Sequence, residues 1–379
     1  MTLEPRTADW LALWLVPGIG PKRIAALLDA LGRIEDILSA SHSALTQAGL
    51  SSELAQAVME ARESMELKAE LTRIEDQGIT LVDWESPDYP RLLTQIADAP
   101  PLLYLKGQTR FNGPLHLAFV GSRKASWQGK SLTERLVKRL AQLHPEIVIV
   151  SGLALGIDGA AHKAALEAGL QTIAVLGSGL GEIYPPSHKS LAQEVAAHGA
   201  LVSEFPMTTG PQAQNFPLRN RIISGISQGV LVVEAGQRSG ASITANLALE
   251  QGREVFALPG APDSPFSYGT NRMIQQGRAK LVIEAEDMLV ELLPDFLAGL
   301  PPVFDPQQKA QKQPDLDPEE LALLTVLESG PLHQDQIAQG LQKPVHLVLA
   351  LLTALELKGV IVNRSGSLYE LNHPRLNRP

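Results

Sequence analysis

Residues 117–126 read Leu-Ala-Phe-Val-Gly-Ser-Arg-Lys-Ala-Ser, an apolar run that ends in a glycine and two basic side chains. A short apolar run bounded by a turn residue is typical of a strand that is buried on both faces. A glycine at the end of such a strand lets backbone amides approach a phosphate, and the start of the next helix favours negative charge. The stretch therefore predicts a strand, an anion-binding loop and a helix in succession.

Further apolar runs continue this pattern, and helix-competent segments separate most of them. Apolar strands that alternate with helices imply a parallel sheet covered on both faces. We therefore expect an α/β fold with an extended Rossmann-like domain at residues 79–298. Within it, a short strand at 79–82 and a proline-marked extended segment come before the α/β core. The expected core strands after the first are residues 147–150, 172–176, 201–204, 230–234, 254–258 and 281–283.

Residues 1–78 are expected to form a helical domain, because leucine and isoleucine recur there at helical spacing. Within it, residues 16–23 (Val-Pro-Gly-Ile-Gly-Pro-Lys-Arg) predict a tight turn between two helices. The turn resembles a helix-hairpin-helix (SAM-like) motif, in which turn amides meet a DNA phosphate. Such turns also serve as plain helix connectors, and the acidic surroundings favour that structural interpretation.

Residues 299–316 are rich in Pro, Gln and Lys and are predicted to be a linker. Residues 317–379 predict three helices (321–327, 333–341 and 345–358) and two strands around a Ser365-Gly366 turn, a layout similar to a winged helix. The third helix begins Val-His-Leu-Val-Leu-Ala, whereas reading base edges needs Arg, Lys, Asn or Gln. We therefore predict a protein-contact or regulatory role for this domain.

Bulk composition narrows the possible classes of protein. The 379 residues contain no cysteine, which excludes disulfides, thiol catalysis and cysteine-based metal sites. No apolar run is long enough for a membrane span and no signal-peptide pattern is present, so a cytoplasmic protein is expected. The net charge is −9, but residues 115–280 hold 15 Lys and Arg against 11 Asp and Glu. This local basic surplus coincides with the glycine-rich loops.

The loop after the first core strand lacks the spacing of known nucleotide sites. It is neither the G-x-G-x-x-G of dinucleotide folds nor a P-loop. The loop contains Arg123 and Lys124 instead. The guanidinium of arginine can donate two hydrogen bonds to phosphate oxygens, and the ammonium group of lysine adds a compact positive charge. Gly121, Ser122, Arg123 and Lys124 are therefore expected to bind a phosphodiester that lies across the loop.

The next loop carries Asp158 and His162, which are spaced to share one face of a helix. Asp158 is expected to act as an N-cap, with small residues that pack the helix on the sheet. Two ligands do not make a zinc site, so no metal is predicted. Lys163 is expected to face the phosphate path.

Residues 215–224 (Asn-Phe-Pro-Leu-Arg-Asn-Arg-Ile-Ile-Ser) combine an aromatic ring, two arginines and an amide at the start of a helix. This combination supplies base stacking, phosphate pairing and edge hydrogen bonding. Phe216, Arg219, Asn220 and Arg221 are therefore candidate contacts, although one of the arginines could instead pair with Glu204 or Glu234.

The loop after the fifth core strand adds Arg238 and Ser239 as further candidates. Because parallel strands end on one side of a sheet, all these loops are expected to converge on one groove. The basic residues expected there are Arg123, Lys163, Arg219, Arg221 and Arg238.

Taken as a set, these motifs resemble the DNA-processing protein A family (DprA, also called Smf). The matching segments cover about residues 115–285, and the flanking helical and winged-helix-like segments also match the family's usual layout. The motifs are Gly121-Ser122-Arg123, residues 151–158, residues 216–224, Glu234-Ala235 with Ser239-Gly240, residues 250–260 and residues 269–277.

The resemblance implies a non-enzymatic protein without a cofactor that binds single-stranded DNA. It further implies a homodimer and a partner, the RecA recombinase, to which incoming DNA is handed in natural transformation. Phosphate contacts would fall on the glycine loop at 121–123 and on residues 219–221, and Phe216 would line a base pocket.

An enzyme that hydrolyses nucleoside monophosphates is the main alternative, since related Rossmann-like proteins do so with an acidic residue beside a glycine-rich loop. Residues 236–244 contain no carboxylate for that role. Glu204 and Glu234 lie at strand ends and remain candidates for a general base. A dinucleotide-dependent oxidoreductase would need the glycine motif and the ribose-binding acid that this chain lacks.

Overall fold

A computed structural model describes residues 4–237, 239–293, 316–328, 330–358, 360–364 and 368–371. The chain divides into two compact units, Met1–Gly299 and Leu300–Pro379. Residues 299–315 of the predicted linker (299–316), Arg238 and residues 365–367 lie outside the described residues. Across the described residues, no helix is both long and apolar enough to cross a membrane.

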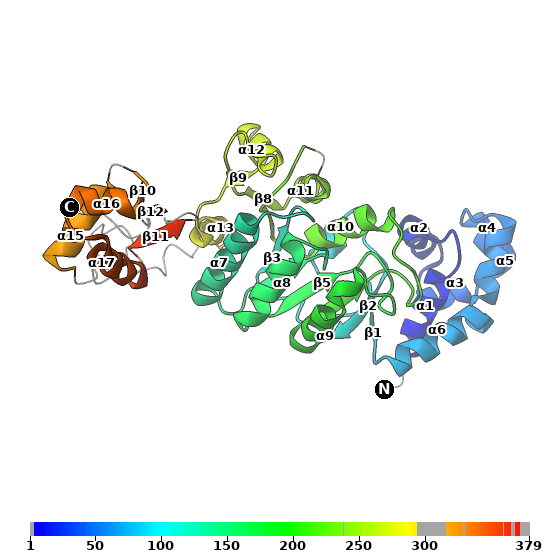
Figure 1. The fold of residues 1–379 in the computed structure, drawn as a ribbon. Coiled ribbons are helices and arrows are strands. Elements are labelled where there is room, and N and C mark those ends of the chain that lie inside the picture. Colours follow the sequence, from blue (N-terminus) through cyan, green and yellow to red (C-terminus); the bar gives the residue numbers. More distant parts are fainter. Residues whose placement is uncertain are drawn as a thin grey trace. The chain divides into compact units, whose positions relative to one another are not determined.

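The first unit is built on one nine-stranded sheet of order β1-β2-β6-β5-β4-β3-β7-β8-β9 (Figure 1). Strands β3 to β9 pair in parallel, whereas β2 pairs antiparallel with both β1 and β6. The strands are β1 (Thr80–Asp83), β2 (Leu102–Gly107), β3 (His116–Val120), β4 (Val148–Ser151), β5 (Thr172–Val175), β6 (Ala200–Ser203), β7 (Gly229–Val232), β8 (Glu254–Ala257) and β9 (Lys280–Leu281).

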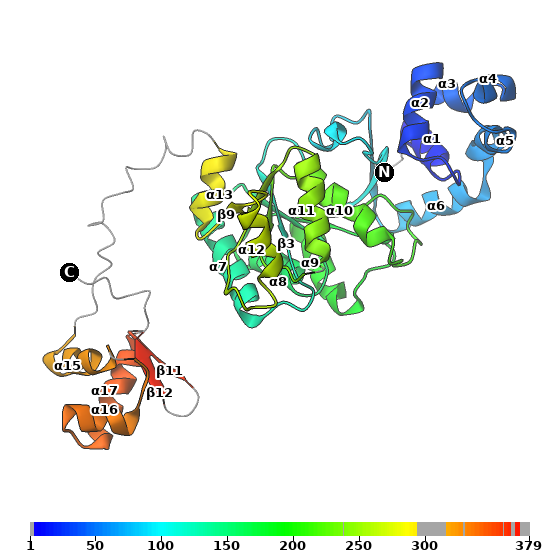
Figure 2. The ribbon, with the colours of Figure 1, turned by 90° about the horizontal axis from the view of Figure 1, so that it is seen from above.

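Helices cover both faces of this sheet (Figures 1 and 2). Alternate residues of β3 explain why: Leu117 and Phe119 join the apolar cluster under α7, α8 and α13, whereas Ala118 and Val120 join the cluster under α10, α11 and α12. The helices are α7 (Trp127–Leu143), α8 (Ile157–Glu167), α9 (Lys189–His198), α10 (Asn215–Gly225), α11 (Gly240–Glu250), α12 (Tyr268–Gln275) and α13 (Ala285–Leu292), with short 3₁₀ turns at Leu93–Gln95 and Pro186–His188.

The N-terminal helices lie beside the β1 edge of the same unit (Figure 1). They share a buried cluster with β2, β5 and α9, so they are not an isolated bundle. Two polar contacts add to this packing: Trp14 Nε1 donates to the Glu204 carbonyl at 2.9 Å, and Met207 N donates to Glu70 Oε1 at 2.6 Å. The helices are α1 (Pro5–Trp14), α2 (Pro21–Leu31), α3 (Ile34–Leu38), α4 (His42–Gln47), α5 (Ser52–Glu60), a 3₁₀ turn (Ala61–Glu63) and α6 (Met65–Asp76).

The predicted helical hairpin forms between α1 and α2. Gly18 has φ +89°, a conformation that favours glycine, and the Arg23 side chain donates to the Gly18 carbonyl, which ties the turn to the second helix. Lys22 is exposed beside it. The geometry is that of a connected helix pair with its turn at the surface.

The described residues of the second unit form three helices and a three-stranded sheet of order β10-β12-β11. Val348, Leu352 and Leu355 of the third helix are buried in its core, while Val345, Leu347 and Leu349 are at least 36% exposed. The exposed side of this helix is thus apolar, as the sequence indicated. The elements are α15 (Pro318–Leu327), β10 (Leu332–His333), α16 (Gln334–Leu341), α17 (Val345–Leu357), β11 (Ile361–Arg364) and β12 (Leu368–Leu371).

Two expectations about the first unit need correction. Residues 102–107 form a strand that sequence patterning did not assign, and this strand makes that edge of the sheet antiparallel. The connection from β1 to β2 contains no crossover helix, and a parallel pairing would need one. In addition, Asp158 is not the N-cap of α8, because Gly156 occupies that position and Asp158 lies within the first turn.

Two buried histidines predict a marked loss of stability in mild acid. Burial lowers the pKa of His116 to about 4 and that of His162, which hydrogen-bonds Thr172 Oγ1 at 2.7 Å, to about 3. An unfolded histidine titrates near pH 6.5, so below that pH the unfolded state takes up protons that the folded state excludes. Together they should remove roughly 3 kcal/mol of unfolding free energy between pH 6.5 and 5.

Urea unfolding at pH 7.5, 6.0 and 5.0 measures this loss. The variant His162→Gln should show a shallower pH dependence than the wild type, whereas His346→Gln, at an exposed position, should not. An identical pH dependence in wild type and His162→Gln would contradict the prediction.

Candidate nucleic-acid interface

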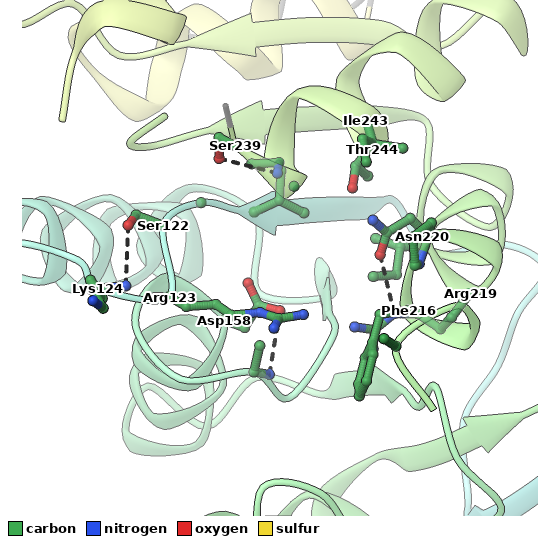
Figure 3. A pocket seen from close by; sticks show the side chains of 18 of the residues that line it. Ser122, Arg123, Lys124, Asp158, Phe216, Arg219, Asn220, Ser239, Ile243 and Thr244 are labelled. Atoms are coloured by element: carbon green, nitrogen blue, oxygen red, sulfur yellow. Dashed lines mark hydrogen bonds between the residues drawn. The ribbon is translucent and has the colours of Figure 1, made fainter. Parts of the chain in front are cut away.

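The predicted loops surround an open groove at the carboxyl ends of β3 and β7. The chain leaves β3 toward β4 on one side and returns through β7 on the other, so this is the topological switch point where α/β sheets bind ligands. The groove has a volume of about 720 Å³. It is lined by the loop after β3, the start of α8 and the starts of α10 and α11 (Figure 3).

Close backbone packing holds the loop after β3 in place. A side chain at Gly121 would meet Ile157 at 2.5 Å, and one at Gly156 would meet the Ser122 carbonyl oxygen at 2.1 Å. Ile157 N donates to that same carbonyl at 3.3 Å. The loop therefore sits directly on the start of α8, with Arg123 and Lys124 exposed at the groove.

Arg123 and two aromatic rings form the most specific feature of the groove. The Arg123 guanidinium carbon lies 5.2 Å from the centre of the Phe216 ring, within the range of a cation–π contact. The Tyr184 ring lies on Phe216 as well, with ring centres 5.6 Å apart. Figure 3 shows the Arg123 side chain extending across the groove toward the side on which Phe216 lies. The two ring planes are tilted by 52°. An exposed cation beside a pair of aromatic rings suits a phosphate and its base.

Sequence patterning missed Tyr184 as a site residue. The ring is 43% exposed and lines the groove from the segment between β5 and α9. The only signal in the sequence was an aromatic residue before two prolines in a loop at a strand's carboxyl end.

Arg219 lines the groove but is almost entirely buried. Its Nη1 donates to the Gly152 carbonyl at 2.7 Å and also to the Val175 carbonyl, and its Nε donates to Asn220 Oδ1 at 3.2 Å. Burial lowers its pKa to about 10, while the nearby charge of Asp158 opposes that change. A side chain at Gly152 would overlap the guanidinium at 2.5 Å. Arg219 thus forms part of the groove floor and links α10 to the ends of β4 and β5 through these hydrogen bonds. Asn220 lies beside it.

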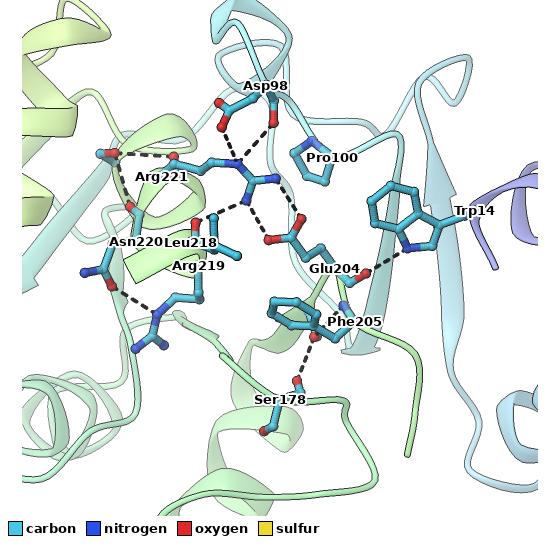
Figure 4. A network of polar contacts seen from close by, with 12 residues as sticks. Trp14, Asp98, Pro100, Ser178, Glu204, Phe205, Leu218, Arg219, Asn220 and Arg221 are labelled. Atoms are coloured by element: carbon cyan, nitrogen blue, oxygen red, sulfur yellow. Dashed lines mark hydrogen bonds and ion pairs between the residues drawn. The ribbon is translucent and has the colours of Figure 1, made fainter. Parts of the chain in front are cut away.

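Arg221 does not line the groove, so it is not placed there to bind phosphate as predicted. It forms instead the pairing with Glu204 that the sequence left open as the alternative. Both of its terminal nitrogens donate to Glu204, at 2.6 and 2.7 Å, and its Nε pairs with Asp98 Oδ2 at 3.0 Å (Figure 4). The guanidinium and the Glu204 carboxylate are both buried. Helical geometry explains the outcome, because residues two apart point to different sides of α10.

Some of the remaining candidate residues line the groove and others do not. Ser122, Lys124 and Ser239 line the groove, and the Ser239 hydroxyl accepts from Ala241 N at 3.3 Å as the cap of α11. Lys163 does not reach the groove, because it lies in a separate hollow between α8 and α9, so its expected place on the phosphate path is wrong. The structure does not describe Arg238.

Acidic residues near the groove are occupied by other contacts. Glu234 accepts from Ser126 N at 2.9 Å and from the Ser126 hydroxyl, and Glu204 is paired with Arg221. Asp158 accepts from Gly152 N at 3.2 Å and Ala154 N at 3.4 Å, and burial raises its pKa. In the described part of the chain, no group of three or more acidic or histidine side chains is arranged to hold a metal ion.

The contact between Gly156 and the Ser122 loop predicts a sensitive backbone position. Gly156→Ala would combine a positive φ of +84° with a methyl group 2.1 Å from the Ser122 carbonyl oxygen, so the loop must move. We expect a loss of about 2–4 kcal/mol in unfolding free energy. We also expect the affinity for an oligonucleotide to fall at least tenfold.

Gly169→Ala is the matched control, because Gly169 has φ +72° but open space around it. It should lose only about 1 kcal/mol and leave binding unchanged. Chemical denaturation and oligonucleotide titration measure both quantities. Equal effects of the two substitutions would contradict the role given to the loop contact.

Comparison with known proteins agrees with this architecture. Family models match residues 80–293 (DNA recombination-mediator protein A), 307–367 (DprA winged helix domain) and 12–63 (SAM-like helix-hairpin-helix tandem). The chain is 42% identical to Protein Smf of Escherichia coli (strain K12) over 329 residues, 86% of each chain.

Two solved structures are also similar. DNA processing protein A of Streptococcus pneumoniae matches with a TM-score of 0.66 at 35% identity, covering 77% of this chain and 99% of that one. DNA processing protein A of Helicobacter pylori, studied for its single-stranded DNA binding mode, matches with a TM-score of 0.52 at 30% identity over 57% and 96%. With its central family model spanning more than half of its length, the chain belongs to the DNA recombination-mediator protein A family.

Proposed function

We propose that this protein binds single-stranded DNA in the groove at the carboxyl ends of β3 and β7. The observation that carries the proposal is the Arg123 guanidinium over the Phe216 ring at an open groove. The cation pairs with a phosphate while the ring stacks on the adjoining base, and neither interaction depends on sequence. Ser122, Lys124, Asn220 and Ser239 line the same groove and supply further polar contacts. The relative from Helicobacter pylori is described as a single-stranded DNA binder.

The groove is better suited to holding a strand than to cleaving a nucleotide. A phosphoribohydrolase would need a free carboxylate as base. Glu234 is bonded to Ser126, and Glu204 is bonded to Arg221. We therefore propose a non-enzymatic role in which the protein protects incoming DNA and helps to load the RecA recombinase in the cytoplasm.

We propose that the protein forms a homodimer through the β9 edge of the same sheet. Strand β9 is the last strand of the order and has no described strand beyond it, and Leu281 and Ile283 there are 44% and 64% exposed. An open edge with exposed apolar side chains is suited to pairing with a second copy. Light scattering of the full chain against an Ile283→Lys variant tests this part of the proposal, because the variant should be monomeric.

Titration with fluorescent oligothymidine at several salt concentrations tests the proposed function. Affinity should fall as salt rises, because bound lysine and arginine release counterions from the DNA. Affinity that does not change with salt would contradict a phosphate groove. In parallel, release of free base from AMP would favour the hydrolase instead.

Removal of the second unit should leave oligonucleotide binding intact within about threefold. Helix α17 exposes Val345, Leu347 and Leu349 rather than base-reading side chains. A chain ending at residue 299 keeps the whole first unit. Titration of the truncated and full-length chains with the same oligonucleotide measures the difference, and a tenfold loss would show that the winged-helix unit contributes to DNA binding.

A further inference from the structure

Trp127, the first residue of α7, is 83% exposed, the largest fraction among the large apolar side chains that the structure describes. The other three tryptophans, Trp10, Trp14 and Trp84, are buried or half-buried. Burying an indole normally stabilises a protein, because the ring carries a large apolar area. An indole left in water is therefore a candidate for contact with another molecule, provided that its surroundings also suit a ligand.

The backbone under Trp127 is held firmly. Ser126 donates its N–H to Glu234 at 2.9 Å, and its hydroxyl accepts from Gly129 N at 2.9 Å. Gly129 packs so closely that a side chain there would meet the Glu234 carboxyl carbon at 2.4 Å. The start of α7 is thereby fixed to the end of β7. A ring on such an anchored backbone loses little conformational freedom when it binds a ligand.

The position of Trp127 is continuous with the groove. Lys124 lines the groove three residues earlier, so the two Cα atoms are at most about 11 Å apart. Side chains on a helix lean toward its N-terminus, which directs the indole back toward that loop. At about 3.4 Å per stacked nucleotide, this span corresponds to roughly three nucleotides.

The charges around Trp127 complement a phosphate backbone. Lys124 and Lys130 are exposed and form no ion pair among the described residues. Lys130 is three residues after Trp127, so the two side chains are neighbours on one face of α7. The nearest acidic group of the adjacent strand, Glu234, is already bonded to Ser126. An aromatic ring between two free lysines is the arrangement that single-stranded DNA-binding surfaces use.

We propose that Trp127, flanked by Lys124 and Lys130, is a second base-stacking platform that extends the DNA path beyond the groove. The inference rests on the proposed function of the groove. A strand held at Arg123 and Phe216 leaves past Lys124, and a base about three nucleotides further along stacks on the indole. The two lysines pair with the phosphates on either side of that base.

Affinity measured against oligonucleotide length tests the platform. Trp127→Ala should weaken binding of a thymidine dodecamer about 5- to 100-fold but change that of a thymidine trimer by less than about twofold. Trp127→Tyr should keep most of the affinity, since tyrosine also stacks. Met65→Ala, which removes another highly exposed apolar side chain (78%) far along the sequence, should have no effect.

A fluorescence readout is independent of affinity. Dodecamer binding should quench the emission of the wild-type chain and have little effect on Trp127→Phe, because the other tryptophans are shielded. Equal loss at both lengths in Trp127→Ala, no loss at either length, or identical quenching in wild type and Trp127→Phe would each overturn the platform.

Arg123→Ala separates this inference from the proposed function. If Arg123→Ala binds the dodecamer as tightly as wild type, the groove itself is not the DNA site and the proposed function fails. If Arg123→Ala weakens binding of both lengths while Trp127→Ala weakens neither, the groove stands and only the platform is lost.

Discussion

Replacing Arg123 with alanine is expected to weaken binding of a thymidine dodecamer by about 10- to 100-fold. The substitution removes a charge-assisted hydrogen bond to phosphate and also uncovers the Phe216 ring, 5.2 Å from the guanidinium. Because Arg123 is exposed, unfolding free energy should change by less than about 0.5 kcal/mol. Oligonucleotide titration and urea denaturation of the same preparations measure both effects.

Arg110→Ala is the matched control, since Arg110 is also an exposed loop arginine but does not line the groove. Its affinity should stay within about twofold of wild type. The salt dependence should also become shallower in Arg123→Ala alone, because one phosphate contact is lost. Equal losses in the two variants would show that general positive charge, rather than the groove, governs binding.

Replacing Arg221 with alanine should lower the unfolding free energy by about 3–5 kcal/mol. The guanidinium forms two hydrogen bonds to Glu204 and an ion pair with Asp98, and removing it leaves the Glu204 carboxylate buried without its cation. Urea denaturation of the full chain measures the loss. Binding of the folded fraction to oligothymidine should change little, because Arg221 does not line the groove.

Lys280 provides the control for this loss of stability, because it forms ion pairs with Glu291 and Glu254 at the surface. Lys280→Ala removes a similar number of ion pairs from exposed side chains and should cost less than about 1 kcal/mol. The double variant Arg221→Met/Glu204→Met should recover part of the lost stability, since no charge stays buried. An Arg221→Ala chain that is fully stable but fails to bind DNA would restore Arg221 to the binding site.

Much of the fold could be predicted because it depends on local patterns. Continuous apolar runs identified the parallel strands to within one or two residues, and glycine after Val120 marked the anion-binding loop. The resemblance to the DNA-processing protein A family, carried by the same glycines and the 216–224 segment, is confirmed by the family model over residues 80–293. Strand β2 escaped prediction, because its pairing with β1 and β6 depends on neighbours far along the chain.

The candidate site was predicted less completely. Arg123, Phe216 and Arg219 come together at the groove as expected, but Lys163 and Arg221 do not. Strand order places loops on a common edge, yet it does not say toward which side each side chain turns. Tyr184 was missed because its tilted ring contact with Phe216 joins segments that lie 32 residues apart.

Sequence alone determined which loops carry glycine and positive charge, since backbone freedom and side-chain charge are properties of single residues. Tertiary structure decided what each arginine does. Arg123 has no carboxylate partner within the described part of the chain and stays exposed over an aromatic ring. Arg219 is held by carbonyls in the groove floor, and Arg221 is neutralised by Glu204. The physical reason is burial, because a guanidinium removed from water needs fixed partners, and only the folded chain determines which arginine is left facing the solvent.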